Sequence, residues 1–168
     1  MVRQISSEFR NEIMEIKHVG VTLSYCYQCG TCSGGCPSFR FTGTFNPRRI
    51  IEDVLLGFKE ELLRDPIIWC CCVCHECLEH CPQGVLVSEL LMKIRELATK
   101  YDNIPDNFRA EVETLVNTGQ INPKNPAVDR RRVSLGLKEA PAAPVEEIKK
   151  LIEITGLINF LPEKKEVE

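Results

Sequence analysis

The sequence predicts a mainly α-helical fold that surrounds a cysteine-rich centre. Apolar residues recur at three- and four-residue steps along most of the chain, as in amphipathic helices, and no convincing alternation of apolar and polar residues predicts a strand. All ten cysteines lie between Cys26 and Cys81. Hydrophobic residues make up 43 % and charged residues 27 % of the 168 residues, which is a globular composition. We therefore expect one ordinary domain, or a small domain with an extension.

Charge and hydropathy argue against nucleic acid and membrane as partners. The chain has 21 Lys and Arg against 24 Asp and Glu, a net charge of -3, whereas nucleic acid requires a basic surface. No run approaches the length of apolar residues that spans a bilayer. Residues Met1 to Glu8 lack the apolar core of a secretory signal, so we expect a cytoplasmic protein. Because thiols stay reduced there, ten cysteines favour metal binding over disulfides.

The cysteines form two copies of one motif, C-x2-C-x2-C-x3-C-P. The first copy consists of Cys26, Cys29, Cys32 and Cys36, followed by Pro37. The second consists of Cys71, Cys74, Cys77 and Cys81, followed by Pro82. This is the spacing of bacterial-type two-cluster ferredoxins. Three cysteines on a tight loop hold one [4Fe–4S] cluster, and the x3 step and the proline carry the fourth cysteine away to the other cluster.

We therefore assign a crossed set of ligands to each cluster. The first cluster is assigned Cys26, Cys29, Cys32 and Cys81. The second is assigned Cys71, Cys74, Cys77 and Cys36. Structural zinc sites use pairs of ligands on knuckles separated by a longer loop, and three successive cysteines in each copy would leave ligands over.

Four further residues of the second copy could carry chemistry but are not needed as ligands. We interpret Cys70 and Cys72 as small buried hydrophobic residues, the alternative being a redox-active or substitute ligand pair. His75 and His80 are interpreted as surface residues or as residues outside the ligand set, because no cysteine is missing for a Rieske-type centre.

Helices are predicted on both sides of each motif. Ser6 and Ser7 precede a short helix that ends near Gly20, and Asn46 caps a second helix that Asp65-Pro66 stops. After the second motif, a helix whose cap would be Ser88 carries an apolar stripe from residue 86 to 101, and another helix follows up to Gly119. We expect residues 1–119 to form an α-helical ferredoxin domain with the clusters between its helices.

Residues 120–168 are predicted to form a linker, one amphipathic helix and a tail. Residues 120–144 contain four prolines and the run Arg130-Arg131-Arg132, which indicates an extended linker. Apolar residues from Val145 to Leu157 predict a helix with Gly156 as its stop, and residues 163–168 a frayed tail. The apolar face of the helix either folds back on the domain or docks on a partner.

Three segments of the chain resemble the iron–sulfur subunit of the heterodisulfide reductases of methanogenic archaea. They are Tyr25–Pro37, Asn46–Ile51 and Trp69–Pro82, within a similarity that runs from Ser6 to Tyr101. The resemblance implies an electron-transfer protein that connects a subunit holding FAD and iron–sulfur clusters to a catalytic subunit, which reduces the CoM-S-S-CoB heterodisulfide in methanogenesis. It also implies electron bifurcation at the FAD, often with a hydrogenase or formate dehydrogenase as the electron source. The two extra cysteines beside Cys71 depart from the family's simpler pattern.

The residues themselves also favour an electron-transfer protein whose catalytic partner is another subunit. A cluster with four thiolates leaves no coordination position for a substrate, and the chain has neither a Gly-x-Gly-x-x-Gly nor a Cys-Cys-Gly motif, so we expect no catalytic site on it. The iron–sulfur subunit of a succinate or fumarate oxidoreductase would need a [2Fe–2S] domain before Cys26, and a free ferredoxin has little use for the C-terminal extension. A related bacterial disulfide or quinone oxidoreductase stays open as an alternative.

Overall fold

The computed structural model describes residues 5–122, 125–138 and 141–161, and these residues form helices without any strand. The predicted all-helical fold is confirmed. The chain divides into two compact units, Met1–Ile104 and Pro105–Glu168. The first unit contains α1 (Ser7–Met14), α2 (Val19–Leu23), α3 (Thr31–Gly34), α4 (Pro37–Thr42), α5 (Pro47–Leu56), α6 (Lys59–Arg64), the 3-10 helix η1 (Pro66–Cys70), α7 (Glu76–Glu79) and α8 (Val87–Thr99). The second contains α9 (Asp106–Thr118), α10 (Pro126–Ser134), α11 (Val145–Thr155) and the 3-10 helix η2 (Leu157–Phe160).

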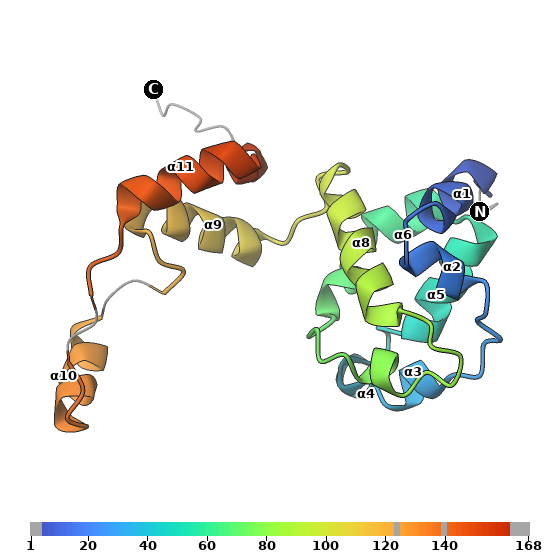
Figure 1. The fold of residues 1–168 in the computed structure, drawn as a ribbon, viewed down its shortest axis with the longest axis horizontal. Helices are drawn as coiled ribbons and strands as arrows, with labels where there is room; N and C mark the ends of the chain where they lie inside the picture. Colours follow the sequence, from blue (N-terminus) through green and yellow to red (C-terminus); the bar gives the residue numbers. More distant parts are fainter. Residues whose placement is uncertain (1–4, 123–124, 139–140, 162–168) are drawn as a thin grey trace. The chain divides into compact units, whose positions relative to one another are not determined.

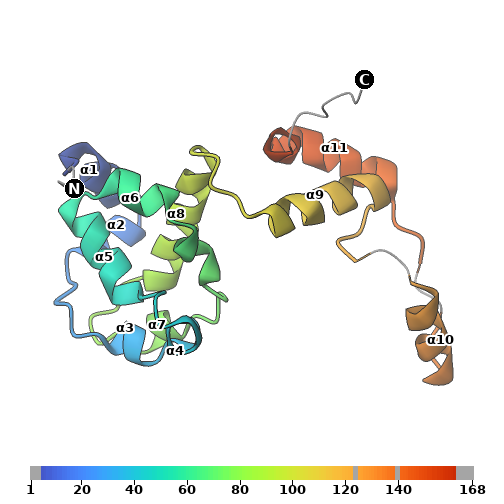
Figure 2. The same ribbon diagram turned by 180° about the vertical axis from the view of Figure 1, so that it is seen from behind.

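The core of the first unit is built mainly from the apolar faces of α1, α5, α6 and α8. Its largest fully buried side chains are Phe9, Ile13, Leu23, Phe45, Ile51, Val54, Leu63, Ile68, Val85, Leu90, Leu91 and Ile94. Both ribbon views show the short helices α3, α4 and α7 together at one end of this unit (Figures 1 and 2). Because these short helices border the cysteine motifs, the motifs are gathered at that end of the core.

The helix boundaries agree with the predicted caps at most positions. The Ser6 side chain accepts a hydrogen bond from the Phe9 N–H at 3.1 Å, and Asn46 caps α5. Three predictions are wrong. The helix that Asn46 caps does not run to Asp65 but ends at Leu56, before Gly57 with a φ of 77°, and α6 follows as a separate helix. The first helix ends at Met14 and not near Gly20, which lies in α2, where a Cβ would be 2.0 Å from the Met14 carbonyl oxygen. Ser88 does not cap α8 but is buried within its first turn, because helical spacing alone does not tell which polar residue of that turn faces inward.

In the second unit α9 packs against α11, and the Arg109 guanidinium donates to the Phe160 carbonyl at 2.7 Å. The unit therefore begins at Pro105, before α9, whereas the sequence placed the boundary after Gly119. The apolar spacing predicted both helices but carried no information about which helices pair. Packing on α9 buries Ile152 and leaves Ile154 of α11 82 % exposed.

The predicted extended linker contains a helix. Asn125 caps α10 by accepting a hydrogen bond from the Ala127 N–H at 2.8 Å, and Pro126 occupies the first helical turn, where proline is tolerated. The Arg130–Arg132 run lies within this helix. Pro123 and the predicted tail at 163–168 lie outside the described residues. No helix among the described residues is long and apolar enough to cross a membrane.

Candidate functional site

The two copies of the cysteine motif follow the same backbone path. The second residue after the first cysteine has a positive φ in each copy, 61° at Gln28 and 54° at Val73. The fourth residue does so as well, with 87° at Gly30 and 63° at His75. A one-turn helix then begins, α3 in the first copy and α7 in the second. A positive φ is costly for a β-branched residue such as Val73, so the loop geometry, and not residue preference, imposes this turn.

The first copy opens onto a hollow that a cysteine of the second copy completes. Its cysteines are Cys26, Cys29, Cys32 and Cys81. The hollow encloses about 340 Å³, including the space at its mouth. Arg48 and Ile51 of α5 and Val87 of α8 also line it. We call it the first hollow.

The second hollow has the complementary composition. Cys36 of the first copy lines it together with Cys71, Cys74 and Cys77. It encloses about 300 Å³, close to the size of the first hollow. The structure thus places the eight motif cysteines around two hollows, four at each.

The two extra cysteines are not buried hydrophobic residues, so that interpretation is wrong. Cys70 and Cys72 are both exposed. Cys72 lines the second hollow, whereas Cys70 lines neither hollow. His80 is exposed, as expected of a surface residue. His75 also lines the second hollow, and its Nδ1 lies 3.0 Å from the Ser88 hydroxyl.

Side-chain hydrogen bonds reach the sulfur atoms of the first hollow. The Gln28 amide nitrogen lies 3.4 Å from Cys26 Sγ, and the Thr31 hydroxyl lies 3.3 Å from Cys29 Sγ. A thiolate bound to iron has no proton, so it accepts and the amide and hydroxyl donate. Hydrogen bonds to the sulfur atoms are one of the ways in which a protein sets the reduction potential of an iron–sulfur cluster.

Backbone amides approach the fourth cysteine of each copy. The Val85 N–H donates to Cys81 Sγ at 3.3 Å, and the Phe39 N–H donates to Cys36 Sγ at 3.4 Å. In each copy the donor follows the motif's proline, in the segment that carries the chain away. The fourth cysteine is therefore fixed by the backbone that delivers it to the opposite hollow.

Burial changes the acidity of the thiols that lie deepest. Burial, followed by the neighbouring thiols Cys71 and Cys32, raises the pKa of Cys77 to about 12. Burial also raises the pKa of Cys32, whereas the hydrogen bond from Thr31 lowers the pKa of Cys29. The buried thiols therefore stay neutral until a positively charged metal centre favours their thiolates.

Ser33 ties the first copy to the start of α5. Its buried hydroxyl donates to Asn46 Oδ1 at 2.7 Å and accepts from the Arg48 N–H at 2.9 Å. The same Asn46 oxygen accepts from the Arg49 N–H at 3.1 Å. Because α5 begins at this network, α3 and the first turn of α5 are held together beside the first hollow.

Arg95 of α8 holds the chain where it enters the second copy. Its guanidinium donates to the carbonyls of Ile68 at 3.0 Å and Trp69 at 3.1 Å, and also to that of Cys71. It also lies over the Trp69 ring, 5.4 Å from the ring centroid. One side chain therefore fixes the last turn before the first cysteine of this copy.

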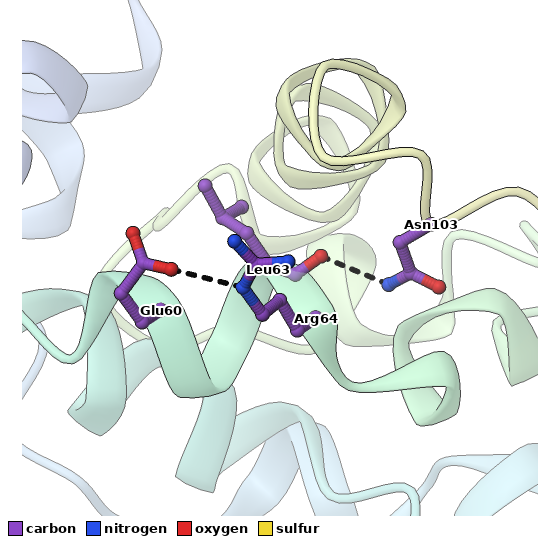
Figure 3. Close-up of polar contacts among 4 residues, drawn as sticks. All are labelled: Glu60, Leu63, Arg64 and Asn103. Carbon is purple, nitrogen blue, oxygen red and sulfur yellow. Dashed lines mark hydrogen bonds and ion pairs between the residues drawn. The ribbon is translucent and has the colours of Figure 1, made fainter.

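Asn103 secures the same segment from the end of the first unit. Its side-chain nitrogen donates to the Leu63 carbonyl at 2.9 Å, beside the ion pair of Arg64 with Glu60 (Figure 3). Its own carbonyl accepts from the Trp69 indole N–H at 2.8 Å. Sequence reasoning missed Ser33, Arg95 and Asn103; only a comparison of the two copies, which sets Ser33 opposite Leu78, carried a signal for one of them.

The donor set fits two cubane clusters. Among the described residues no three Cys, His, Asp or Glu side chains converge tightly enough to hold one metal ion. The cysteines instead line the walls of the two hollows, and a cubane takes one thiolate at each of its four irons. Soft thiolate ligands favour iron–sulfur clusters among the metal centres of proteins.

Comparison with known proteins supports this assignment. Residues 22–85 match the 4Fe-4S dicluster domain family, so the chain holds two [4Fe–4S] clusters. A subunit of the H(2):CoB-CoM heterodisulfide,ferredoxin reductase of Methanothermobacter thermautotrophicus is 35% identical over 98% of this chain and 92% of its own length. The CoB--CoM heterodisulfide reductase iron-sulfur subunit of Methanopyrus kandleri is 32% identical over 88% of this chain and 79% of its own length.

A third relative is a subunit of the H(2)/formate:CoB-CoM heterodisulfide,ferredoxin reductase of Methanococcus maripaludis, 37% identical over 83% of this chain and 79% of its own length. These alignments extend well beyond the cysteine motifs. The resemblance read from the motifs is confirmed. The chain belongs to the iron–sulfur subunit family of the CoB–CoM heterodisulfide reductases that these relatives represent.

Proposed function

We propose that this chain is the electron-relay subunit of a CoB–CoM heterodisulfide reductase complex. It receives electrons from the flavin subunit, which holds FAD, and delivers them to the catalytic subunit, which reduces the CoM-S-S-CoB heterodisulfide in methanogenesis. The observation that carries the proposal is the pair of hollows within one compact unit, each lined by four of the eight motif cysteines. When bound there, the two clusters supply one-electron carriers, and the residues of this chain position and tune them.

The proposed ligands follow the lining of the hollows. Cys26, Cys29, Cys32 and Cys81 hold the cluster of the first hollow, and Cys71, Cys74, Cys77 and Cys36 hold that of the second. The location of one cysteine from the opposite copy in each hollow supports this crossed arrangement. It also ties the two copies together, so that neither cluster forms from a single copy.

The helices α5 and α8 provide the medium between the two clusters. In α5, Pro47 lines the second hollow and Arg48 lines the first. In α8, Val87 lines the first hollow and Ser88 lines the second. The first turns of two helices thus border both hollows, which supports transfer from one cluster to the other without a mobile carrier.

Catalysis takes place outside this chain in our proposal. Four thiolates per cluster leave no open coordination position for a disulfide. The names of the relatives mention H2, formate and ferredoxin, and we propose that a hydrogenase or formate dehydrogenase supplies the flavin subunit, which bifurcates the electrons. All ten cysteines are free of disulfides, which suits a location in the reducing cytoplasm.

The test uses the full chain purified without oxygen. We expect about eight iron and eight sulfide per chain, and full reduction by a strong chemical reductant. Alone, the reduced chain should leave the CoM-S-S-CoB heterodisulfide intact, and addition of the purified catalytic subunit should start its reduction. The chain stripped of its iron serves as the control and should support no turnover. Heterodisulfide reduction by the loaded chain alone, at the rate of the complex, would overturn the relay assignment.

A further inference from the structure

The segments that supply most of the lining of each hollow carry opposite charge. Residues 16–51 contain no Asp or Glu, and their charged residues are Lys17, Arg40, Arg48 and Arg49. Residues 65–92 contain no Lys or Arg, and their charged residues are Asp65, Glu76, Glu79 and Glu89. One residue of each set reaches a hollow directly: Arg48 lines the first and Glu76 lines the second. Because an added electron makes a cluster more negative, a cation nearby favours reduction and a carboxylate opposes it.

Hydrogen bonding to the sulfur atoms also favours reduction of the cluster in the first hollow. The first hollow offers donors from Gln28 and Thr31, at 3.4 Å and 3.3 Å from its sulfur atoms. In the second hollow, among the described residues, backbone N–H donors reach Cys36 and Cys71. The thiols of Cys72 and Cys74 interact with each other, and the Ser38 hydroxyl bonds to Cys72 and not to a ligand cysteine. A thiol is a weak donor compared with an amide or a hydroxyl. The first hollow therefore stabilises the extra negative charge better.

Burial adds to this difference. In the first hollow all four ligand cysteines are half-buried or exposed. In the second hollow Cys71 is half-buried and Cys74 is exposed, but Cys36 and Cys77 are buried, at 7 % and 8 % exposed. Water stabilises the more highly charged reduced state, so the more buried cluster is the harder one to reduce.

Two residues act against these three effects. The first is His80, whose Nε2 lies 3.0 Å from Glu76 Oε1. The second is Arg95. Its charge lies beside Cys71, at the second hollow. The Arg95 guanidinium also binds the carbonyls of Ile68 and Trp69. It does not line the second hollow, whereas Arg48 lines the first hollow. Taken together, charge, hydrogen bonding and burial still make the cluster of the first hollow the easier one to reduce.

We propose that the two hollows are unequal in reduction potential, the first holding its cluster at the higher potential, so that the second hollow receives electrons and the first passes them on. The transfer balances as one electron, lost by the reduced cluster of the second hollow and gained by the oxidised cluster of the first. The direction of flow rests on the proposed relay function, but the difference in potential does not. The mouth of the first hollow, where Tyr27 is 60 % exposed, is then the exit toward the electron acceptor.

The test is a redox titration of the full chain with both clusters bound, monitored by electron paramagnetic resonance. We expect two separate midpoint potentials. Arg48→Gln and Thr31→Val should lower the higher potential and leave the lower one in place. Glu76→Gln should raise the lower potential and leave the higher one in place.

Each variant has a matched control. Arg49→Gln, Thr99→Val and Glu79→Gln change the same residue types at positions that line neither hollow, and both potentials should stay unchanged. A single midpoint for both clusters, or a shift of the lower potential in Arg48→Gln, overturns the inference. The titration needs no partner protein. If a chain with two clusters has the higher midpoint potential in the second hollow, this inference is contradicted and the proposed function is not. A chain with fewer clusters contradicts the proposed function as well.

Discussion

The first and second copies of the cysteine motif have the same loop but different supports. Ser33 joins the first copy to the adjacent helix α5 through Asn46 and the Arg48 N–H. The second copy is supported from a distance in sequence, by Arg95 on α8 and by Asn103 after it. The two copies thus share the geometry of the loop, whereas their surroundings differ in charge, hydrogen bonding and support.

The largest difference between the copies is expected when one proposed ligand of each copy is removed. Cys36→Ala should abolish the cluster of the second hollow and spare the first, although Cys36 belongs to the first copy. Cys81→Ala should have the opposite effect. Each variant should retain about four of eight irons, and electron paramagnetic resonance should identify the remaining cluster.

Cys70→Ser is the matched control for these two substitutions, because Cys70 lines neither hollow. It should keep both clusters. If Cys36→Ala instead removes the cluster held by Cys26, Cys29 and Cys32, each copy binds its own cluster and the crossed assignment is wrong.

The next largest effect concerns the support of the second copy. Arg95→Gln removes charged hydrogen bonds to three carbonyls, each worth about 1.5–3 kcal/mol in other proteins, and we expect a loss of roughly 2 kcal/mol or more in unfolding free energy. Chelation of iron over time should remove the cluster of the second hollow before that of the first. Lys93→Gln, which breaks a surface ion pair on the same helix, should change stability by under about 1 kcal/mol. Equal loss rates for both clusters would contradict local support by Arg95.

A smaller effect is expected in the first copy. Ser33→Ala leaves the buried Asn46 oxygen and Arg48 N–H with fewer partners, at a cost of about 1–3 kcal/mol in unfolding free energy. Denaturant unfolding of the loaded chain measures this. Ser24→Ala, at an exposed site, should cost under about 0.5 kcal/mol. Similar values for both serines would show that the Ser33 network does not support this copy.

The smallest effect is expected at one position that is equivalent in the two copies. Tyr27 and Cys72 both follow the first cysteine of their copies, and each interacts with the second cysteine through a side-chain hydrogen bond. Tyr27→Phe should lower the potential of the first cluster slightly, and Cys72→Ala should lower that of the second by less, since a thiol is the weaker donor. Both variants should keep both clusters. Loss of a cluster in Cys72→Ala would make Cys72 a ligand.

Some features were predictable because they depend on neighbours in sequence. Asn46 followed by Pro47 predicted the start of α5, and Gly119 and Gly156 end α9 and α11 with φ values of 70° and 71°. The helix α10 was missed because its prolines lie at the flanks, where they start a helix as readily as they interrupt one. Exposure of Cys70 and Cys72 could not be predicted, because burial depends on what packs against them.

The helical fold, the two [4Fe–4S] clusters and the family were predictable from the amino-acid sequence, because each depends on the spacing of residues along the chain. The residues that surround the cysteines were not predictable in this way and are set by the packing of the helices. Arg95 meets carbonyls that precede it by 24 to 27 residues, and Arg48 and Glu76 reach different hollows. The physical reason is that ligand spacing is a local property of the backbone, whereas charge, hydrogen bonding and burial around a thiolate arise from residues that folding brings together.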